Sequence, residues 1–512
     1  MNKLKQALLF SAIIILVLPH SIFGQSKFIT DSLDIYITRE MKRWNIPGVA
    51  ISIVKDGKVI YQKGFGVREV GKPDKVDENT LFMIASNTKA YTATAVALLD
   101  KEKRLSLNEK VTRYLPYFRL KDSLSSRDVT VKDLLSHRIG FFTFQSDFLN
   151  WDCNLSRTDL IMNMRHVKPM YGFRTNFGYT NMGFVTAGEV IHAVTDTTWE
   201  VFLKYNIFLP LQMTRTTTRN TDIVTDNNAA KPYTIFDGKL VVLKYDSIDN
   251  IAPCGGLNSC VKDISNWILM QLDSGKFEGK QVIPFDVLKR TRTSTTIVGD
   301  VANPLFPSTH FRTYGLGWFM EDYVGRKIIS HDGGANGFVT NTTLVPEEKY
   351  GFTILTNTDA NAFMDALQMQ LLDDAFNVPY RNLSAIYYNK SAKGTAEDDS
   401  VTHAMWATAA KKPKPALDLK TYTGKYTNEI YGNIEIKEEK GKLVIHFSHH
   451  PHLTGNLEPL GENKFVCNYN PVAWGVKETP FIVVDGKVQS VVISVNGGID
   501  YLPYEFKKDS TN

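Results

Sequence analysis

The chain has 512 residues, of which 43% are hydrophobic and 22% are charged. This composition is typical of a soluble globular protein, and the length predicts two to three domains. The formal net charge is +5 at pH 7, and without a basic arm or stripe it gives no reason to expect a nucleic-acid partner. Four cysteines do not make a disulfide framework. Cys254 and Cys260 either form a bridge in an oxidising compartment or remain two free thiols.

The N-terminus has the pattern of an export signal. Two lysines precede an apolar run over 7–18, and the small Gly24 suits the position before a cleavage site. The apolar run is too short to span a bilayer. We therefore expect a cleavable signal peptide over 1–24, a periplasmic or secreted protein, and no transmembrane segment after cleavage; an uncleaved anchor is the alternative. Because the first cysteine is Cys153, a lipid-anchored mature form is not expected.

Up to about residue 380 the chain mixes helical and strand periodicity, which indicates an α+β fold. Asp56-Gly57 between two apolar runs predicts the turn of a β-hairpin. The elements expected in chain order are a helix over 29–44, strands over 49–54 and 59–61, mainly helices from 86 to about 275, strands over 314–318, 327–329 and 351–355, and a helix over about 360–376.

The last part of the chain differs in composition and period. Residues 381–416 are polar and contain the stiff run Lys411-Lys-Pro-Lys-Pro415, so they predict a linker with one short helix. From 417 to 512 the apolar residues recur with period two in short runs separated by turn signals. This pattern predicts a small antiparallel sandwich or barrel.

A serine three residues before a lysine occurs three times, and its context differs each time. Ser52 and Lys55 lie inside the predicted hairpin, where residues three apart face opposite sides of a strand. Ser259 and Lys262 lie at the start of a helix, where Ser259 is expected to be the N-cap residue, with Asp263 in the first turn. The third pair lies at the start of a long run of small residues.

That third pair, Ser86 and Lys89, fits nucleophilic catalysis. A serine hydroxyl needs a base within hydrogen-bond reach, and a lysine one helical turn later meets that requirement. The apolar flanks over 82–85 and 90–97 favour a buried lysine, whose lowered pKa suits a general base. A helix N-terminus also offers backbone N–H groups to a developing oxyanion. On this segment alone, an N-cap serine followed by a surface lysine explains the pattern equally well.

Two further clusters carry groups that fit the same chemistry. Tyr179 and Asn181 stand between two glycines; the phenol can move a proton, and the amide can hold a substrate or orient the lysine. The alternative is that this cluster has no catalytic role and is a turn with a tyrosine packed in the core. His331 begins the run His331-Asp332-Gly333-Gly334, whose glycines on an edge strand can expose N–H groups to an oxyanion.

No metal or cofactor is expected from the histidines. His331 has no nearby histidine or cysteine at ligand spacing, so its alternative is a capping or core residue. His449, His450 and His452 in the tail are expected in a solvated loop rather than in a metal site.

In this order and at these separations, the three clusters resemble the serine β-lactamase and penicillin-binding superfamily, most nearly its class C-like branch of serine hydrolases, esterases and D-peptidases. The resemblance implies an antiparallel sheet flanked by helices plus an all-helical subdomain, over 25–380. The tail over 417–512 is similar to the lipocalin-like β domain often appended to such enzymes, and we expect it to shield or shape the active-site cleft. The flanking motifs that share the resemblance are Asn45-Ile-Pro-Gly48, Leu134-Leu-Ser-His137, Pro253-Cys-Gly-Gly-Leu257, Tyr314-Gly-Leu-Gly-Trp318 and Tyr422-Thr-Gly-Lys-Tyr426.

The resemblance also implies a role for each residue. Ser86 is the acylated nucleophile, and Lys89 and Tyr179 share the work of general base and proton shuttle. The oxyanion hole uses the backbone N–H groups of Ser86 and Gly334. The residues expected to bind substrate are Asn181, His331, Asp332, Gly333 and Gly334.

One departure from the family pattern bears on the substrate. Enzymes that handle β-lactams usually carry Lys-Thr-Gly where this chain has His331-Asp332-Gly333. If Asp332 faces the pocket, its charge repels a carboxylate by about 1 kcal/mol or more, which predicts weak or no β-lactam turnover. The expected function is an exported serine hydrolase that cleaves an ester or an amide or peptide bond in a small molecule or peptide. The alternatives are β-lactamase or penicillin-binding peptidase activity, or a sensor that binds without turnover.

Overall fold

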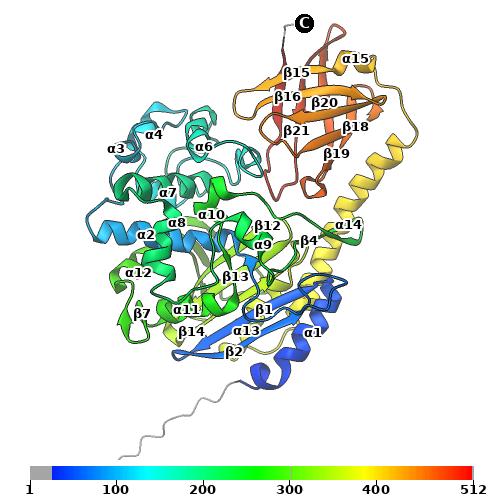
Figure 1. The fold of residues 1–512 in the computed structure, drawn as a ribbon. Coiled ribbons are helices and arrows are strands. Elements are labelled where there is room, and N and C mark those ends of the chain that lie inside the picture. Colours follow the sequence, from blue (N-terminus) through cyan, green and yellow to red (C-terminus); the bar gives the residue numbers. More distant parts are fainter. Residues whose placement is uncertain (1–25, 301–302, 510–512) are drawn as a thin grey trace, which may run out of the picture.

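The computed structural model describes residues 26–300 and 303–509, so the predicted signal peptide lies outside the described residues. An eight-stranded antiparallel sheet forms the centre of the first domain, with strand order β2-β1-β14-β13-β12-β11-β10-β9 (Figure 1). Its strands are β1 (Gly48–Lys55), β2 (Lys58–Gly66), β9 (Thr296–Asp300), β10 (Phe311–Tyr314), β11 (Phe319–Tyr323), β12 (Arg326–Ala335), β13 (Phe338–Val345) and β14 (Tyr350–Thr356).

Helices cover both faces of this sheet, which confirms the α+β prediction. On one face, α1 (Leu33–Trp44) and α13 (Phe363–Ala375) bury one apolar cluster against β1 and β14. On the other face lie α11 (Val261–Leu272) and the helical region. The helices of that region are α2 (Thr88–Lys101), α3 (Val111–Tyr114), α4 (Ser123–Asp128), α5 (Val131–Leu135), α6 (Arg157–Asn163), α7 (Asn181–Thr195), α8 (Trp199–Leu203), α9 (Asn220–Thr225), α10 (Ala252–Gly255) and α12 (Phe285–Thr291).

The first predicted hairpin is confirmed and one predicted strand is wrong. Asp56 and Gly57 both have positive φ, as a two-residue hairpin turn between β1 and β2 requires. Of residues 314–318, expected as a strand, only Tyr314 belongs to one, as the last residue of β10, and 315–318 form the connection between β10 and β11. Gly317 sits there with φ +76°, and a Cβ on it would lie 2.5 Å from the Lys89 carbonyl oxygen. The connection therefore needs a glycine because it passes close to α2.

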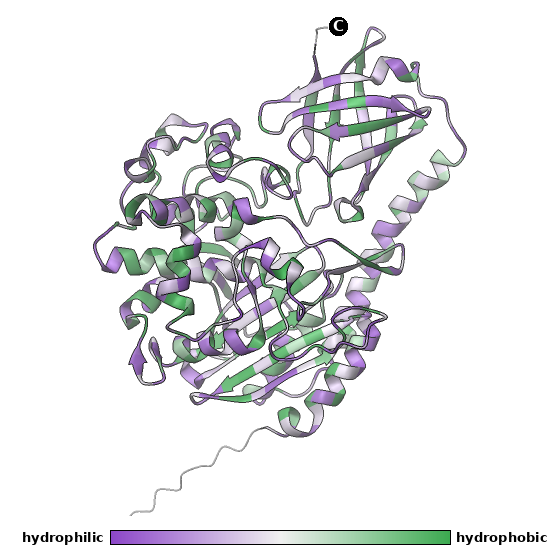
Figure 2. Cartoon of the chain, viewed as in Figure 1, coloured by the Kyte–Doolittle hydropathy of each residue, from purple (hydrophilic) through white to green (hydrophobic). Residues whose placement is uncertain are grey.

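The segment expected as a linker with one short helix contains a long one, α14 (Leu383–Ala409). Its first residues pack on α13, and its last turns approach the strands of the second domain (Figure 1). Figure 2 shows hydrophilic residues along much of its length. A helix without a continuous apolar stripe gives no amphipathic period, and such helices typically bridge domains through solvent.

The tail is a closed barrel, which decides between the two expected architectures. Its strands follow one another in chain order, and the first pairs with the last, as in an up-and-down barrel. Most of its buried side chains belong to the same apolar cluster as those of the helical region. The strands are β15 (Gly424–Asn428), β16 (Gly432–Glu439), β17 (Lys442–Phe447), β18 (Thr454–Gly461), β19 (Lys464–Asn470), β20 (Val476–Val484), β21 (Lys487–Ile493) and β22 (Tyr504–Lys508).

Two sequence-level questions are answered by the fold. All four cysteines carry free thiols, so Cys254 and Cys260 are not bridged. Over residues 26–300 and 303–509, no helix is both long and apolar enough to cross a membrane.

Candidate active site

Ser86 lies on the short 3-10 turn η2 (Ala85–Asn87), which runs directly into α2. Just before the turn, β3 (Phe82–Met83) pairs with β6 (Asn258–Ser259), and this pairing anchors the turn. Ala85 has φ +45°, a left-handed conformation that costs a residue with a Cβ about 1 kcal/mol or more and that tends to occur at functional sites. Ser86 is partly exposed, whereas both of its neighbours are buried. The turn thus presents one hydroxyl to the cavity in front of it.

Lys89 is fully buried, and its amine is surrounded by three oxygen atoms. Its Nζ lies 2.9 Å from Ser86 Oγ, 2.7 Å from Asn181 Oδ1 and 2.8 Å from the carbonyl oxygen of Cys254. Burial lowers the pKa of Lys89 to about 8, against the opposing influence of Cys254 and Asp147. In the neutral amine, the two carbonyl oxygens accept its two N–H bonds, and the lone pair is left for the Ser86 hydroxyl. This is the geometry of a general base.

Tyr179 is a buried phenol beside Ser86, the candidate nucleophile. Burial raises its pKa well above 10, although a hydrogen bond with Ser86 opposes the shift. Lys89 Nζ lies 4.7 Å from the centre of the Tyr179 ring, and His137 stacks on that ring at 4.3 Å. Tyr179 is therefore a neutral phenol at physiological pH, suited to donating a proton.

Asn181, the first residue of α7, orients the lysine. Its Oδ1 accepts from Lys89, and its Nδ2 donates to Asp147 Oδ2 at 2.6 Å. Both ends of the amide are therefore occupied inside the protein. Of the two roles that the sequence left open for Asn181, these contacts support holding the lysine rather than holding a substrate.

His331 is close to the site but is not a cation. Its Nδ1 lies 2.7 Å from the carbonyl oxygen of Asp332, so that nitrogen carries the proton and Nε2 accepts from the Tyr314 hydroxyl at 3.0 Å. Burial lowers the pKa of His331 to about 3, and the positive charge of the nearby Lys89 acts in the same direction. The histidine that stands in place of the family's lysine is therefore uncharged, because the ring is buried and both nitrogens are occupied.

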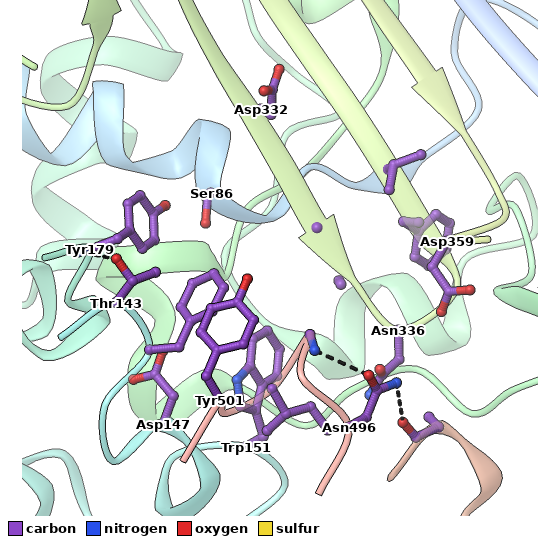
Figure 3. A pocket seen from close by; sticks show the side chains of 18 of the residues that line it. Ser86, Thr143, Asp147, Trp151, Tyr179, Asp332, Asn336, Asp359, Asn496 and Tyr501 are labelled. Carbon is purple, nitrogen blue, oxygen red and sulfur yellow. Dashed lines mark hydrogen bonds between the residues drawn. The ribbon is translucent and has the colours of Figure 1, made fainter. Parts of the chain in front are cut away.

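The neighbours of His331 on β12 have different surroundings. Asp332 lines the cavity, but its Oδ1 accepts from Asn341 Nδ2 at 2.7 Å, and Figure 3 shows the carboxylate directed away from Ser86. The condition for direct repulsion of a substrate carboxylate at Ser86 is therefore not met. A Cβ on Gly333 would lie 2.1 Å from the Ile84 carbonyl oxygen, so Gly333 allows close packing and does not line the cavity.

Gly334 keeps the geometry expected of an oxyanion donor. β11 pairs with β12 only as far as Ser330, so residues 331–335 have no strand on that side within the described chain. Gly334 is exposed to the cavity and meets no atom at its Cβ position. Its N–H as a partner to that of Ser86 stays a prediction.

The other two serine–lysine pairs lack this arrangement. Lys55 donates to the Glu348 carbonyl oxygen. Ser52 is buried and faces the opposite side of β1 from Lys55. Ser259 is a strand residue bonded to Thr216 Oγ1 at 2.8 Å, and Cys260 is the N-cap of α11, so the predicted cap is wrong. Lys262 is exposed.

The cavity in front of Ser86 has a volume of about 850 Å³ and is lined by both domains. Figure 3 shows Tyr501 and Asn496 of the barrel across from Tyr179 and Thr143 of the first domain. Residues from the loops at the mouth of the barrel form part of its wall: Val472, Ala473, Gly475, Asn496, Gly498, Ile499 and Tyr501.

Sequence reasoning missed several residues of this site. His137 was noted only as part of a flanking motif, yet it stacks on Tyr179 and accepts from the Thr180 N–H through Nδ1 at 2.9 Å. Asp147 and Tyr501 had no local signal, since each gains its role from a partner distant in the chain. His450, expected in a solvated loop, is buried against Phe148, which corrects that expectation.

The sheet, the helical region and the serine–lysine–tyrosine cluster between them define a β-lactamase-like fold. Residues 33–375 match the model of the Beta-lactamase family, and the chain belongs to that family. Residues 408–508, the end of α14 and the barrel, match a model described as a domain of unknown function, DUF3471.

Named relatives and solved structures agree with this assignment. The chain is 28% identical over 433 residues to the unguisins hydrolase ungD of Aspergillus violaceofuscus, covering 79% of this chain and 76% of that protein. It is 28% identical over 336 residues to the protein flp of Staphylococcus aureus (strain MW2), covering 64% of this chain and 63% of flp, less than two thirds of its length. The structure of an octameric penicillin-binding protein homologue from Pyrococcus abyssi superposes with a TM-score of 0.62 at 22% identity, covering 93% of this chain and 100% of that chain. The structure of SurE superposes with a TM-score of 0.56 at 17% identity, covering 94% of this chain and 98% of that chain. At these identities the two structures show the shared fold.

Proposed function

We propose that this protein is a serine hydrolase that works through an acyl-enzyme on Ser86. The observation that carries the proposal is the environment of Lys89, whose buried amine touches Ser86 Oγ while two carbonyl oxygens hold its other bonds. A surface lysine after an N-cap serine, the alternative reading, would be solvated and free of such partners. The hydrolase name of a relative at 28% identity supports the same reaction class.

The geometry supports a two-step reaction. Ser86 Oγ attacks the substrate carbonyl carbon as its proton passes to Lys89, and the backbone N–H groups of Ser86 and Gly334 stabilise the oxyanion. The proton then passes through the Tyr179 phenol to the departing alcohol or amine, which leaves the acyl group on Ser86. Water attacks the ester so formed, its proton takes the same route back to Ser86 Oγ, and a carboxylic acid is released.

The charge of the cavity bears on the substrate class. Carboxyl groups line it at several points, and Arg312 is the one lysine or arginine among the described lining residues. Because His331 is neutral, the position of the family's cation offers a substrate carboxylate no charge. We therefore propose a neutral or amine-bearing ester or peptide as substrate, with weak or no β-lactam turnover. The lining residues that carry a carboxyl group are Asp147, Asp359 and Asp398, together with Asp332, whose carboxylate is directed away from Ser86.

We also propose that the enzyme acts after export. This rests on the sequence pattern over 1–24, a short apolar run after two lysines and before a small residue. Free, buried thiols at Cys254 and Cys260 suit either side of the membrane and neither support nor oppose export.

A substrate panel tests the proposed function directly. Purified mature protein is assayed with nitrophenyl esters, D- and L-aminoacyl amides and a chromogenic cephalosporin, beside the Ser86→Ala variant. We expect turnover of esters or amides that is lost in Ser86→Ala, whose unfolding midpoint stays that of the wild type. Turnover that survives the substitution contradicts the nucleophile, and efficient cephalosporin hydrolysis that is lost with Ser86 contradicts the substrate class.

A further inference from the structure

A short segment of the first domain connects the candidate active site to the barrel. It is the 3-10 turn η3 (Asp147–Leu149), entered through Ser146 at φ +70°. Asp147 is buried, and its carboxylate accepts from Asn181 Nδ2 at 2.6 Å and from Asn150 Nδ2 at 2.9 Å. Because Asn181 holds Lys89, Asp147 stands one hydrogen bond behind the residue that orients the general base.

Side chains of the barrel contact this segment from the side opposite the active site. The Phe148 ring is fully buried among aromatic side chains of the barrel, where it stacks on His450 at 5.0 Å. The Phe148 N–H donates to Asp500 Oδ2 at 3.3 Å, and the Ser146 N–H donates to the Tyr504 hydroxyl oxygen at 3.1 Å. The other rings around Phe148 are those of Tyr431, Phe447 and Trp474.

Two buried carboxyl groups therefore lie on either side of the domain boundary, Asp147 on η3 and Asp500 in the barrel. Asp500 accepts hydrogen bonds from the hydroxyls of Tyr431 and Tyr504 and from the Leu502 N–H. Burial, together with the charge of Asp500, raises the pKa of Asp147 to about 7. Burial likewise raises the pKa of Asp500 to about 6. Like charges in a dry interface oppose each other's ionisation.

We propose that the barrel is a working part of the active site: Asp500 and Phe148 seat η3 so that Asp147 holds Asn181, and through it Lys89, in the catalytic position. Asp147 and Asp500 are positioning residues, and this inference rests on the proposed function of Ser86 and Lys89. The contacts form one chain from the barrel to the nucleophile, through Asp500, η3, Asn181, Lys89 and Ser86.

The arrangement makes opposite predictions for the two carboxyl groups. An ionised Asp147 favours the protonated form of Lys89, so removing that charge lets the lysine reach its free base at lower pH. An ionised Asp500 disfavours the ionised form of Asp147, so its removal keeps Asp147 charged to lower pH and shifts the deprotonation of Lys89 to higher pH. Other titratable groups lie near the two carboxyl groups. Tyr179 and Cys254 lie beside Asp147, and Tyr431 and Tyr504 lie beside Asp500. His450 stacks on Phe148.

The test is the pH dependence of Ser86 labelling by a fluorophosphonate probe, read by intact mass. The readout is the ratio of the labelling rate constant at pH 6.5 to that at pH 9, where most of the lysine is free base. Relative to the wild type, we expect Asp147→Asn to raise this ratio by up to about twofold, because Asp147 is already mostly protonated at pH 6.5, and Asp500→Asn to lower it about threefold. The matched control is Asp485→Asn, the same change at an exposed hairpin turn of the same barrel, and it should leave the ratio unchanged.

The outcomes separate the inference from the proposed function. No labelling of the wild type at any pH defeats the proposed function itself. Labelling whose ratio is unmoved in both variants, or moved in the same direction in both, overturns the role of the pair while leaving the nucleophile in place. Should Asp500→Asn fail to fold, Tyr504→Phe replaces it. Losing the hydroxyl that stabilises ionised Asp500 keeps Asp500 neutral, so the ratio should again fall; an unchanged or raised ratio overturns the inference.

Discussion

The two domains meet at one cavity and contribute to it in different ways. The first domain supplies the groups that we propose to react, Ser86, Lys89 and Tyr179, from one turn, one helix and the loop before α7. The barrel supplies a wall, with Tyr501 facing the cavity, and a buried carboxyl group, Asp500, behind it. The chemistry therefore depends on contacts within the first domain, whereas the shape of the cavity and the setting of the lysine depend on the boundary. Substitutions can separate these contributions.

The largest effect is expected within the first domain. Lys89→Gln removes the base while keeping a polar side chain of similar reach, and general-base catalysis is worth about 10²–10⁴-fold. We expect kcat for ester hydrolysis to fall by that amount, measured under saturating substrate. Lys262→Gln makes the same change in the exposed lysine of another serine–lysine pair and should leave kcat within about twofold. A comparable loss in both variants would mean that burial of Lys89 is not what matters.

The next effect tests how firmly the boundary is held. Phe148→Ala empties the aromatic site in the barrel and should lower the free energy of unfolding by about 3 kcal/mol. Chemical denaturation, followed by tryptophan fluorescence, measures the shift of the midpoint. Ile482→Ala, on an exposed position of the barrel, is the control and should change stability by less than about 0.5 kcal/mol. Equal midpoints for Phe148→Ala and the wild type would show that the barrel does not depend on this contact.

A smaller effect separates substrates by size. The Tyr501 ring stacks on Phe144 at 5.5 Å and faces the cavity, and such an aromatic contact is worth about 0.5–1.5 kcal/mol. Tyr501→Ala should therefore lower kcat/KM for long peptide or ester substrates by up to about tenfold and leave nitrophenyl acetate unchanged. Tyr205→Ala, an exposed tyrosine outside the cavity, controls for loss of a surface ring. Equal losses on short and long substrates would place Tyr501 outside the binding surface.

The smallest effect comes from charge at the rim. Asp398 of α14 lines the cavity but is exposed, and an exposed charge pair contributes about 0.2–1 kcal/mol. Asp398→Asn should reduce the preference for an amine-bearing ester over its neutral analogue by about two- to fivefold, and added salt should reduce the difference. Asp399→Asn, one residue on and outside the lining, should leave the preference as it is. Identical results for the two neighbours would remove charge from the account of selectivity.

The candidate reactive groups could be singled out from sequence because each lies in a short pattern that constrains its neighbours. Ser86 and Lys89 are one helical turn apart between apolar flanks, and Tyr179 and Asn181 stand between glycines, so local geometry nearly determines them. The hairpin turn at Asp56-Gly57 was predictable for the same reason. In contrast, α14 has no apolar stripe, and its helical state gives no periodic signal.

The rest depends on contacts between distant residues. Phe148 and Asp500 are 352 residues apart in the chain, and neither carries a motif. The neutral state of His331 follows from burial under Tyr314 and Phe319, which a sequence of His-Asp-Gly-Gly does not reveal. Whether Asp332 faced the pocket likewise depended on Asn341 of the neighbouring strand. Alternation along a strand says which residues share a face, but not which face meets a ligand.

The central claim is that Ser86, and not another serine with a lysine three residues later, forms the covalent intermediate. It is tested most directly by digesting the fluorophosphonate-labelled protein and locating the modified residue by peptide mass spectrometry. The account predicts one modified peptide, carrying the adduct on Ser86, and no adduct in Ser86→Ala. An adduct on Ser52 or Ser259, or a Ser86→Ala protein that labels as fast as the wild type, would contradict it.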